Sequence, residues 1–277
     1  ANTGLSLAVP WKTVGYAAGK VNPGDTVHIA DGTYNETVSR SRSGTAAAYV
    51  VFKSTNRWGA KLVSNSGSDG FGINANYVEI NGIDLTNPGG HGVNGENNHH
   101  IRVVNCHLHH CGNSGFSGGY SDFYHIEGNL CNNNASLSWY SGISIYEAKS
   151  IGDASAGPHI VIRRNICYGN FSAGGPHTDG NGVICDDWNY TQNAGTPYPF
   201  SALVENNLCY NNGGAGIKSS WCDNITFRNN ITYSGLSHRF RPLGRPSQGI
   251  QHGLDYFPAD AVLIRVVVNT IPPYSAA

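Results

Sequence analysis

The feature that most constrains the fold of this sequence is a glycine followed by an apolar residue, which recurs through the middle of the chain. The first two intervals between these pairs are 22 and 23 residues, and the later ones are 27, 40 and 34. Such intervals predict one repeated structural unit, with loops inserted into the later copies. The pairs are Gly70-Phe71, Gly92-Val93, Gly115-Phe116, Gly142-Ile143, Gly182-Val183 and Gly216-Ile217.

A second repeated element has the same phase. Asparagines and cysteines recur at matching positions in the segments IEGNLCNN (126–133), IRRNICYGN (162–170), VENNLCYNN (204–212) and FRNNITYS (227–234). Alternating apolar residues between Asn or Gly predict short strands that end at corners, where a left-handed backbone is needed. A coil of about 22 residues that stacks on its neighbour at roughly 4.8 Å is a parallel β-helix. We therefore expect an all-β solenoid.

The cysteines favour packing over chemistry. Their number, seven, is odd and no CxxC pair occurs, so neither a disulfide framework nor a zinc site is indicated. A free cysteine packs as a small hydrophobe. We expect an inward stack of free thiols at Cys131, Cys167 and Cys209.

One outward column alternates in charge. It predicts a ladder of surface ion pairs along paired strands, which argues against a substrate-binding role for its arginines. The column consists of Glu127, Arg163, Glu205 and Arg228.

We expect a single domain over residues 1–277. Residues 1–25 should cap the open end of the solenoid, because Pro10 can begin a short helix. One face of this helix would carry Trp11, Val14, Ala18 and Val21. Residues 26–235 should form the coils. The Asn-rich pattern then ceases, and residues 236–277 form either a last coil or a C-terminal cap.

Charge and hydropathy exclude two kinds of partner. The chain has 17 basic and 18 acidic residues and no basic run, so we expect no binding to nucleic acid. No segment approaches the roughly 18 consecutive apolar residues of a membrane span. We expect a monomeric, secreted protein, extracellular or periplasmic, from which a signal peptide has been removed.

Negative charge is concentrated in the stretch HTDGNGVICDDW. It holds Asp179, Asp186 and Asp187, and the coil alignment places Glu147 one coil below Asp187. Converging carboxylates repel one another unless a cation or a proton relieves them, and oxygen ligands on loops and strand ends suit Ca²⁺. We predict a calcium site. The alternative is that Asp179 and Asp187 accept hydrogen bonds from backbone N–H groups at turns.

Lys218 is the only cation in its column of the repeat. The alignment places it on the same exposed face as Asp186, one coil apart and two residues displaced, which corresponds to roughly 8 Å between the Cα atoms. A structural explanation for Lys218 at this position is a surface salt bridge. A functional explanation is that Lys218 acts as a base beside a metal site.

Two motifs resemble those of known enzymes. The segment NPGDTVHIADGTY resembles the opening of secreted right-handed β-helix polysaccharide enzymes, which implies a right-handed parallel β-helix with a short N-terminal capping helix. The Asp-Asp strand end, followed a coil later by Gly-x-Lys, resembles the pectate lyases of polysaccharide lyase family 9, in which aspartates bind Ca²⁺ and a lysine is the base. The likeness covers about residues 70–235.

This resemblance implies roles for particular residues. Asp186 and Asp187 match the paired aspartates, and Lys218 matches the base. The family's further aspartate, three positions on, is Tyr190 here, so its role would fall to Asp179 or Glu147.

The predicted function is therefore a calcium-dependent polysaccharide lyase, a carbon–oxygen lyase. It would cleave an acidic, uronic acid-containing polysaccharide such as pectate by β-elimination, because a metal on the uronate stabilises the enolate-like transition state while a base removes the C5 proton. Residues predicted to contact the substrate are Tyr146, Trp188, Trp221 and His177.

Three alternatives remain open. An inverting glycoside hydrolase would resemble the β-helix polygalacturonases, which use three aspartates and an Arg-Ile-Lys element. A uronan epimerase would invert C5 and cleave little. A non-catalytic glycan-binding solenoid, stabilised by calcium, would bind polysaccharide and turn nothing over.

The histidines raise the question of a transition-metal site. Because the sequence gives them no shared geometry, it favours exposed polar positions instead. They are His99, His100, His107, His109 and His110.

Overall fold

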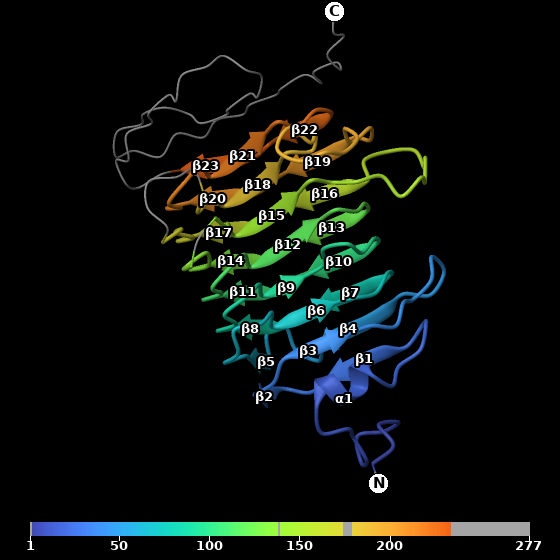
Figure 1. The fold of residues 1–277 in the computed structure, drawn as a ribbon. Helices are drawn as coiled ribbons and strands as arrows, with labels where there is room; N and C mark the ends of the chain where they lie inside the picture. The colour runs from blue at the N-terminus through green and yellow to red at the C-terminus, as the bar shows by residue number, and fades with distance from the viewer. Residues whose placement is uncertain (1, 138, 174–178, 234–277) are drawn as a thin grey trace, which may run out of the picture.

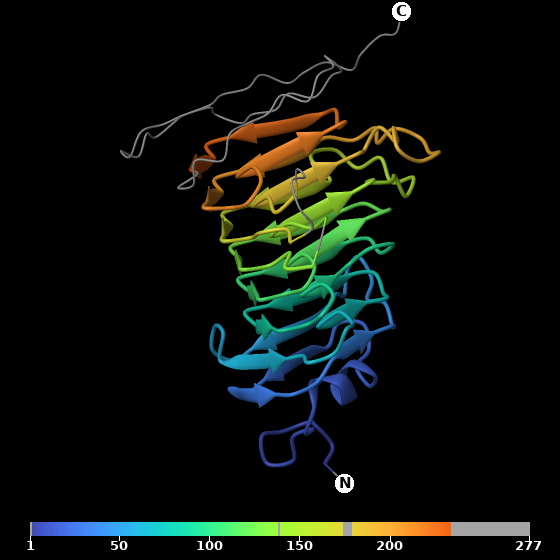
Figure 2. The ribbon, with the colours of Figure 1, turned by 60° about the vertical axis from the view of Figure 1, so that its left-hand side comes forward.

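The structure, a computed structural model, describes residues 2–137, 139–173 and 179–233. Short parallel strands stack coil upon coil from the N-terminus upward (Figure 1), and the turned view shows the same column from another side (Figure 2). The prediction of an all-β parallel β-helix is confirmed. The predicted last coil or C-terminal cap, residues 236–277, lies outside the described residues.

Each coil contributes one strand to each of three parallel sheets, named A, B and C here. Sheet A consists of β1 (Thr26–Ile29), β4 (Val50–Ser54), β7 (Val78–Asn81), β10 (Ile101–Val104), β13 (Tyr124–Glu127), β16 (Ile160–Arg163), β19 (Ala202–Glu205) and β22 (Ile225–Arg228). Sheet B consists of β2 (Gly32–Tyr34), β5 (Ala60–Val63), β8 (Asp84–Thr86), β11 (His107–His109), β14 (Leu130–Asn132), β17 (Ile166–Tyr168), β20 (Leu208–Tyr210) and β23 (Ile231–Tyr233). Sheet C consists of β3 (Val38–Arg40), β6 (Phe71–Ile73), β9 (Val93–Asn94), β12 (Phe116–Gly119), β15 (Ile143–Tyr146), β18 (Val183–Asp186) and β21 (Ile217–Ser220).

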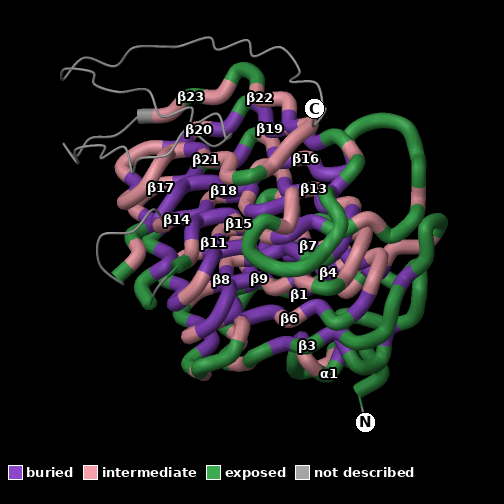
Figure 3. Tube along the Cα trace, turned by 45° about the horizontal axis from the view of Figure 1, so that its top comes forward, coloured by how far each residue is buried: buried purple, intermediate pink, exposed green. Residues whose placement is uncertain are grey.

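The interior is a continuous apolar column. Figure 3 shows the stacked strands largely buried and the connecting loops largely exposed. Cys131, Cys167 and Cys209 lie in register on β14, β17 and β20, fully buried and free. The predicted inward thiol stack is therefore confirmed.

The asparagine column has a different role from the one expected. The left-handed corner belongs to the residue before each asparagine, such as Arg164 with φ 56° and Asn206 with φ 55°. The asparagines point inward, where the Nδ2 of Asn129 donates to Oδ1 of Asn165, and the Nδ2 of Asn165 donates to Oδ1 of Asn207, both at 3.0 Å. A buried amide is stable only when its polar atoms are paired, and the stack pairs them. A second ladder, which the sequence alignment did not reveal, consists of Asn134, Asn170 and Asn212.

The charge ladder is confirmed. Its four members pair in register across β13, β16, β19 and β22. The guanidinium of Arg163 donates to Glu127 at 2.9 Å, and that of Arg228 donates to Glu205 at 2.6 Å.

The N-terminal cap contains the predicted helix, which begins later than Pro10. Helix α1 (Val14–Ala18) has Thr13 as its N-cap. The carboxylate of Glu36 accepts hydrogen bonds from the first two backbone N–H groups, at 2.8 and 2.9 Å. Of the expected apolar face, Val14 and Ala18 are buried on the helix, Val21 is buried after its end, and Trp11 lies before the helix and is partly buried. No helix in the described part of the chain has the length and apolar character needed to cross a membrane.

Candidate functional site

The candidate site lies on the outer face of sheet C, where β15, β18 and β21 are neighbours. Asp186 pairs with Ser220, and Ile184 pairs with Lys218. Lys218 is thus one coil from Asp186 and two residues offset, as the repeat alignment predicted. Alternation along the strands buries Val183 and Cys185 and turns the residues between them outward.

This face is less open than expected. Ile184, which pairs with Lys218, is only 4% exposed, and the Lys218 side chain is half-buried. Burial lowers the pKa of the Lys218 amine below its usual value, whereas the charges of Asp179 and Asp186 act in the opposite direction. Burial is the larger influence. The amine therefore gives up its proton more readily than a surface lysine does.

Asp186 lies among other carboxylates, with the cation Lys218 nearby. Burial raises the pKa of its carboxyl to about 6; Lys218 acts against this rise, and Asp179, Asp187 and Glu147 add to it. No hydrogen bond from another described residue contributes to this balance. A cation placed here would relieve the repulsion.

Asp187 acts at a turn. Its side chain is fully buried and its φ is 53°. One carboxylate oxygen accepts hydrogen bonds from the backbone N–H and the hydroxyl of Thr191, at 2.6 and 2.7 Å. The other accepts from the backbone N–H of Gln192 at 2.8 Å. These contacts correspond to the turn-stabilising alternative considered for this residue.

Glu147 occupies the equivalent turn one coil earlier. It is 2% exposed with φ 42°, and its carboxylate accepts a hydrogen bond from the side-chain amide of Asn193. Asp187 and Glu147 thus both hold the loop of residues 187–201 against the stack.

The four predicted calcium ligands do not converge as one set. Within the described ranges, no three of Glu147, Asp179, Asp186 and Asp187 bring ligand atoms within 4.8 Å of one another. Two of these carboxylates are engaged by the loop, so the complete four-residue site does not fit. Asp179 and Asp186 both act on the charge of Lys218.

The predicted sugar-stacking residues fall into different environments. Trp188 has no exposed surface, and its indole N–H donates to the carbonyl of Ile145 at 3.1 Å. It is a core residue, and the prediction that it stacks on a sugar is wrong because a substrate cannot reach it. Trp221 is 40% exposed, and Tyr146 is half-buried. His177 lies outside the described residues.

Tyr120 is an accessible aromatic residue that sequence reasoning missed. It is 37% exposed and contacts Tyr146 edge to face at 5.6 Å between ring centroids. The repeat could have predicted its position. Gly119 pairs with Tyr146, so Tyr120 occupies the same turn position in its coil as Glu147 does in the next coil.

Comparison with known proteins identifies the fold. A profile described as "Pel9A-like, right handed beta helix region" matches residues 1–152, more than half of the chain. The chain belongs to this family. Membership confirms the expected handedness and the resemblance to pectate lyases. Because the matched range of this Pel9A-like chain ends before Asp186 and Lys218, it bears on the fold rather than on the site.

Two solved structures have similar folds. Pectate lyase Pel9A is 18% identical with a TM-score of 0.52, covering 85% of this chain and 74% of its own. An alginate lyase from Paenibacillus sp. str. FPU-7 is 19% identical with a TM-score of 0.51, covering 79% of this chain and 73% of its own. No curated protein matches the sequence. These likenesses show a fold shared with polysaccharide lyases and do not assign a substrate.

Proposed function

We propose that this Pel9A-like protein is a secreted, monomeric polysaccharide lyase that cleaves a uronic acid-containing polysaccharide such as pectate by β-elimination. The observation that carries the proposal is Lys218 on sheet C, a half-buried amine with a lowered pKa that is influenced by the charges of Asp179 and Asp186. A lysine becomes a general base when burial lowers its pKa toward the working pH.

Lys218 performs the proton transfer in this mechanism. Its neutral amine takes the proton from C5 of the uronate, and the electrons of the C5–H bond form a C4–C5 double bond. The C4–O bond breaks at the same time, and solvent protonates the departing oxygen. Half-burial of the amine favours the neutral form that this step needs, while the aspartates oppose it.

In this proposal, calcium would occupy a partial site made of carboxylate oxygens. Asp179 and Asp186 would hold the ion, and the substrate carboxylate and water would supply the remaining ligands that Ca²⁺ requires. When bound, the ion supplies positive charge that makes the C5 proton more acidic. Asp187 and Glu147 support the site indirectly through the 187–201 loop. Tyr146, Tyr120 and Trp221 would offer aromatic surface to sugar rings.

The test is product formation from a panel of pectate, alginate and glucuronan, with and without Ca²⁺. Elimination yields unsaturated uronates that absorb in the ultraviolet. We expect Ca²⁺-dependent absorbance with at least one polymer and its loss in Lys218→Ala. Lys61→Ala, on the exposed face of sheet B, is the matched control and should retain full activity. Undiminished elimination in Lys218→Ala and in the presence of chelator would contradict the proposal.

An inverting glycoside hydrolase is the second candidate, and the raised pKa of Asp186 favours it. A carboxyl with a pKa of about 6 can hold a proton near neutral pH, as a general acid must, and Asp179 would then be the base. This enzyme would release reducing ends without ultraviolet absorbance. Its activity would fall as the pH rises above about 6, opposite to elimination by a lysine base.

A further inference from the structure

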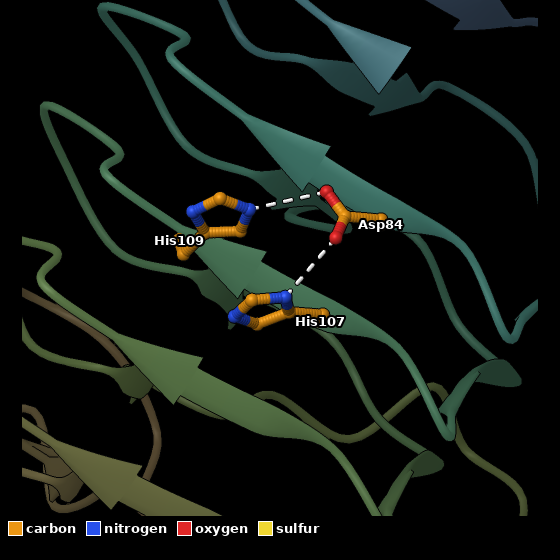
Figure 4. A group of neighbouring side chains, drawn as sticks. All are labelled: Asp84, His107 and His109. Carbon is orange, nitrogen blue, oxygen red and sulfur yellow. Dashed lines mark hydrogen bonds and ion pairs between the residues drawn. The ribbon is translucent and has the colours of Figure 1, made fainter. Parts of the chain in front are cut away.

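A second polar cluster lies on sheet B, away from the Lys218 site. His107 and His109 are two residues apart on β11, so both side chains project from the same outer face of the sheet. Asp84, on the preceding coil, pairs directly with His107 in the strand register. Figure 4 shows the two imidazoles directed at the Asp84 carboxylate. The repeat pattern did not reveal a shared geometry for the histidines, because the comparison did not include Asp84, which lies 23 residues before His107.

The distances within this cluster suit a small metal ion. His107 Nδ1 lies 3.1 Å from one oxygen of Asp84, and His109 Nε2 lies 3.1 Å from the other. One ligand atom from each residue can be chosen so that all three lie within 4.8 Å of one another. Around a tetrahedral ion with bonds near 2.0–2.1 Å, neighbouring ligand atoms are about 3.4 Å apart. The contacts of Asp84 with the two imidazoles are close to this spacing.

The outward-facing ring nitrogens have partners that orient the imidazoles. His107 Nε2 lies 2.8 Å from Oδ1 of Asn132. His109 Nδ1 lies 2.7 Å from Nδ1 of His110 and 3.3 Å from the hydroxyl of Thr86. Histidine ligands in metal sites are held in this way, with one nitrogen on the metal and the other on a fixed polar group.

The cluster is also partly shielded from water. The side chains of Asp84, His107 and His109 are 15%, 19% and 17% exposed, and Trp58 packs against the His107 ring at 5.2 Å between centroids. An ion can reach the cluster from solvent, and the site is dry enough to strengthen its interactions.

We propose that Asp84, His107 and His109 bind a divalent transition-metal ion of the zinc class, which clamps β8 to β11 across two coils. Two imidazole nitrogens and a carboxylate oxygen match the ligands of Zn²⁺, with water completing the coordination. Ca²⁺, which takes oxygen ligands, is not expected to bind here. Because the cluster lies on sheet B, the proposal is independent of the proposed lyase activity.

An ion pair without metal is the competing explanation. Asp84 could simply accept hydrogen bonds from the imidazoles, and these contacts lower the pKa of Asp84 despite its partial burial. Metal binding and this explanation differ in whether the protein takes up added Zn²⁺.

The experiment is calorimetric titration of the full chain with Zn²⁺ at pH 7.5, after treatment with chelator and its removal. We expect one site per chain that Ca²⁺ does not block. Asp84→Asn, which nearly preserves shape, and His107→Ala should each weaken binding about 100-fold or more. His125→Ala, which removes a histidine paired with a single carboxylate, Glu127, is the matched control and should bind as the wild type does.

Thermal unfolding gives a second measurement. Zinc at about 100 times its Kd should raise the midpoint by roughly 5 °C in the wild type and the control, and not in the two site variants. A wild type that binds no zinc, or an Asp84→Asn variant that binds and responds as the wild type does, would overturn the proposal. Lys218→Ala should still bind zinc and His107→Ala should still cleave polymer, so failure of either proposal leaves the other to be judged separately.

Discussion

The clusters on sheets B and C arise from the same strand register, and they differ in what surrounds them. Between Asp84 and His107 the repeat has its basic length of 23 residues, and facing side chains meet directly. Around Asp186 the coils carry long insertions, and the loop of residues 187–201 engages two of the carboxylates. An uninterrupted coil thus leaves polar residues to interact with one another, whereas an inserted loop redirects some of them to hold the loop.

Substitution of Lys218 should distinguish the two clusters most clearly. If it is the base, Lys218→Ala should lower kcat on the preferred uronic polymer by about 10²–10⁴-fold, because a positioned base contributes that much. Initial rates of ultraviolet absorbance measure this. His107→Ala, which alters only the sheet B cluster, should leave kcat unchanged. An equal loss in both variants would contradict the separation of the two sites.

The next largest effect is expected for Trp188, which the fold places in the core. Trp188→Ala should lower the free energy of unfolding by about 3–5 kcal/mol, because it leaves a cavity in the core. Trp221→Ala should leave stability nearly unchanged and raise KM, since its ring is 40% exposed. Chemical denaturation and steady-state kinetics measure the two quantities. Similar stability losses in both variants would contradict the assignment of Trp188 to the core and of Trp221 to the surface.

Substitutions of the adjacent residues Asp186 and Asp187 should change the free energy of unfolding in opposite directions. Asp187→Ala should destabilise the fold by about 3 kcal/mol, because three donors lose a charged acceptor. Asp186→Asn should stabilise it at pH 7 by up to about 3 kcal/mol, since the folded state raises the pKa of this carboxyl to about 6.

The sign follows from linkage. An acid whose pKa is raised on folding destabilises the protein increasingly as the pH rises from its unfolded pKa, 3.8, to about 6. Denaturant midpoints between pH 4 and 7 should therefore fall less in Asp186→Asn than in the wild type. A destabilised Asp186→Asn would mean that this carboxylate is compensated in the fold.

The smallest effect is a shift in the pH profile. The charge of Asp186 raises the pKa of Lys218, so Asp186→Asn should move the rising limb of kcat to lower pH, by an amount of order one unit or less. The pKa of the Lys218 amine, followed by NMR in the calcium-free wild type and variant, measures this shift without requiring turnover. A shift to higher pH would contradict the proposed charge interaction.

Much of the architecture could be predicted because parallel, in-register stacking turns sequence intervals into spatial neighbours. The Cys131, Cys167 and Cys209 stack and the two-residue offset between Lys218 and Asp186 follow from the repeat alone. The role of Asn165 did not follow, since an asparagine at a corner and one just inside it differ by a single position.

The repeat intervals alone predict the periodicity, the solenoid and the face of the coil on which each strand residue lies, because a strand alternates with a period of two. Which polar groups are already engaged depends on the folded chain. Asp187 and Glu147 are engaged by a loop whose path has no repeat, and Trp188, within that loop, is buried in the core. Side-chain availability depends on contacts between segments of unrelated sequence, whereas register depends only on the regular backbone hydrogen bonds between coils.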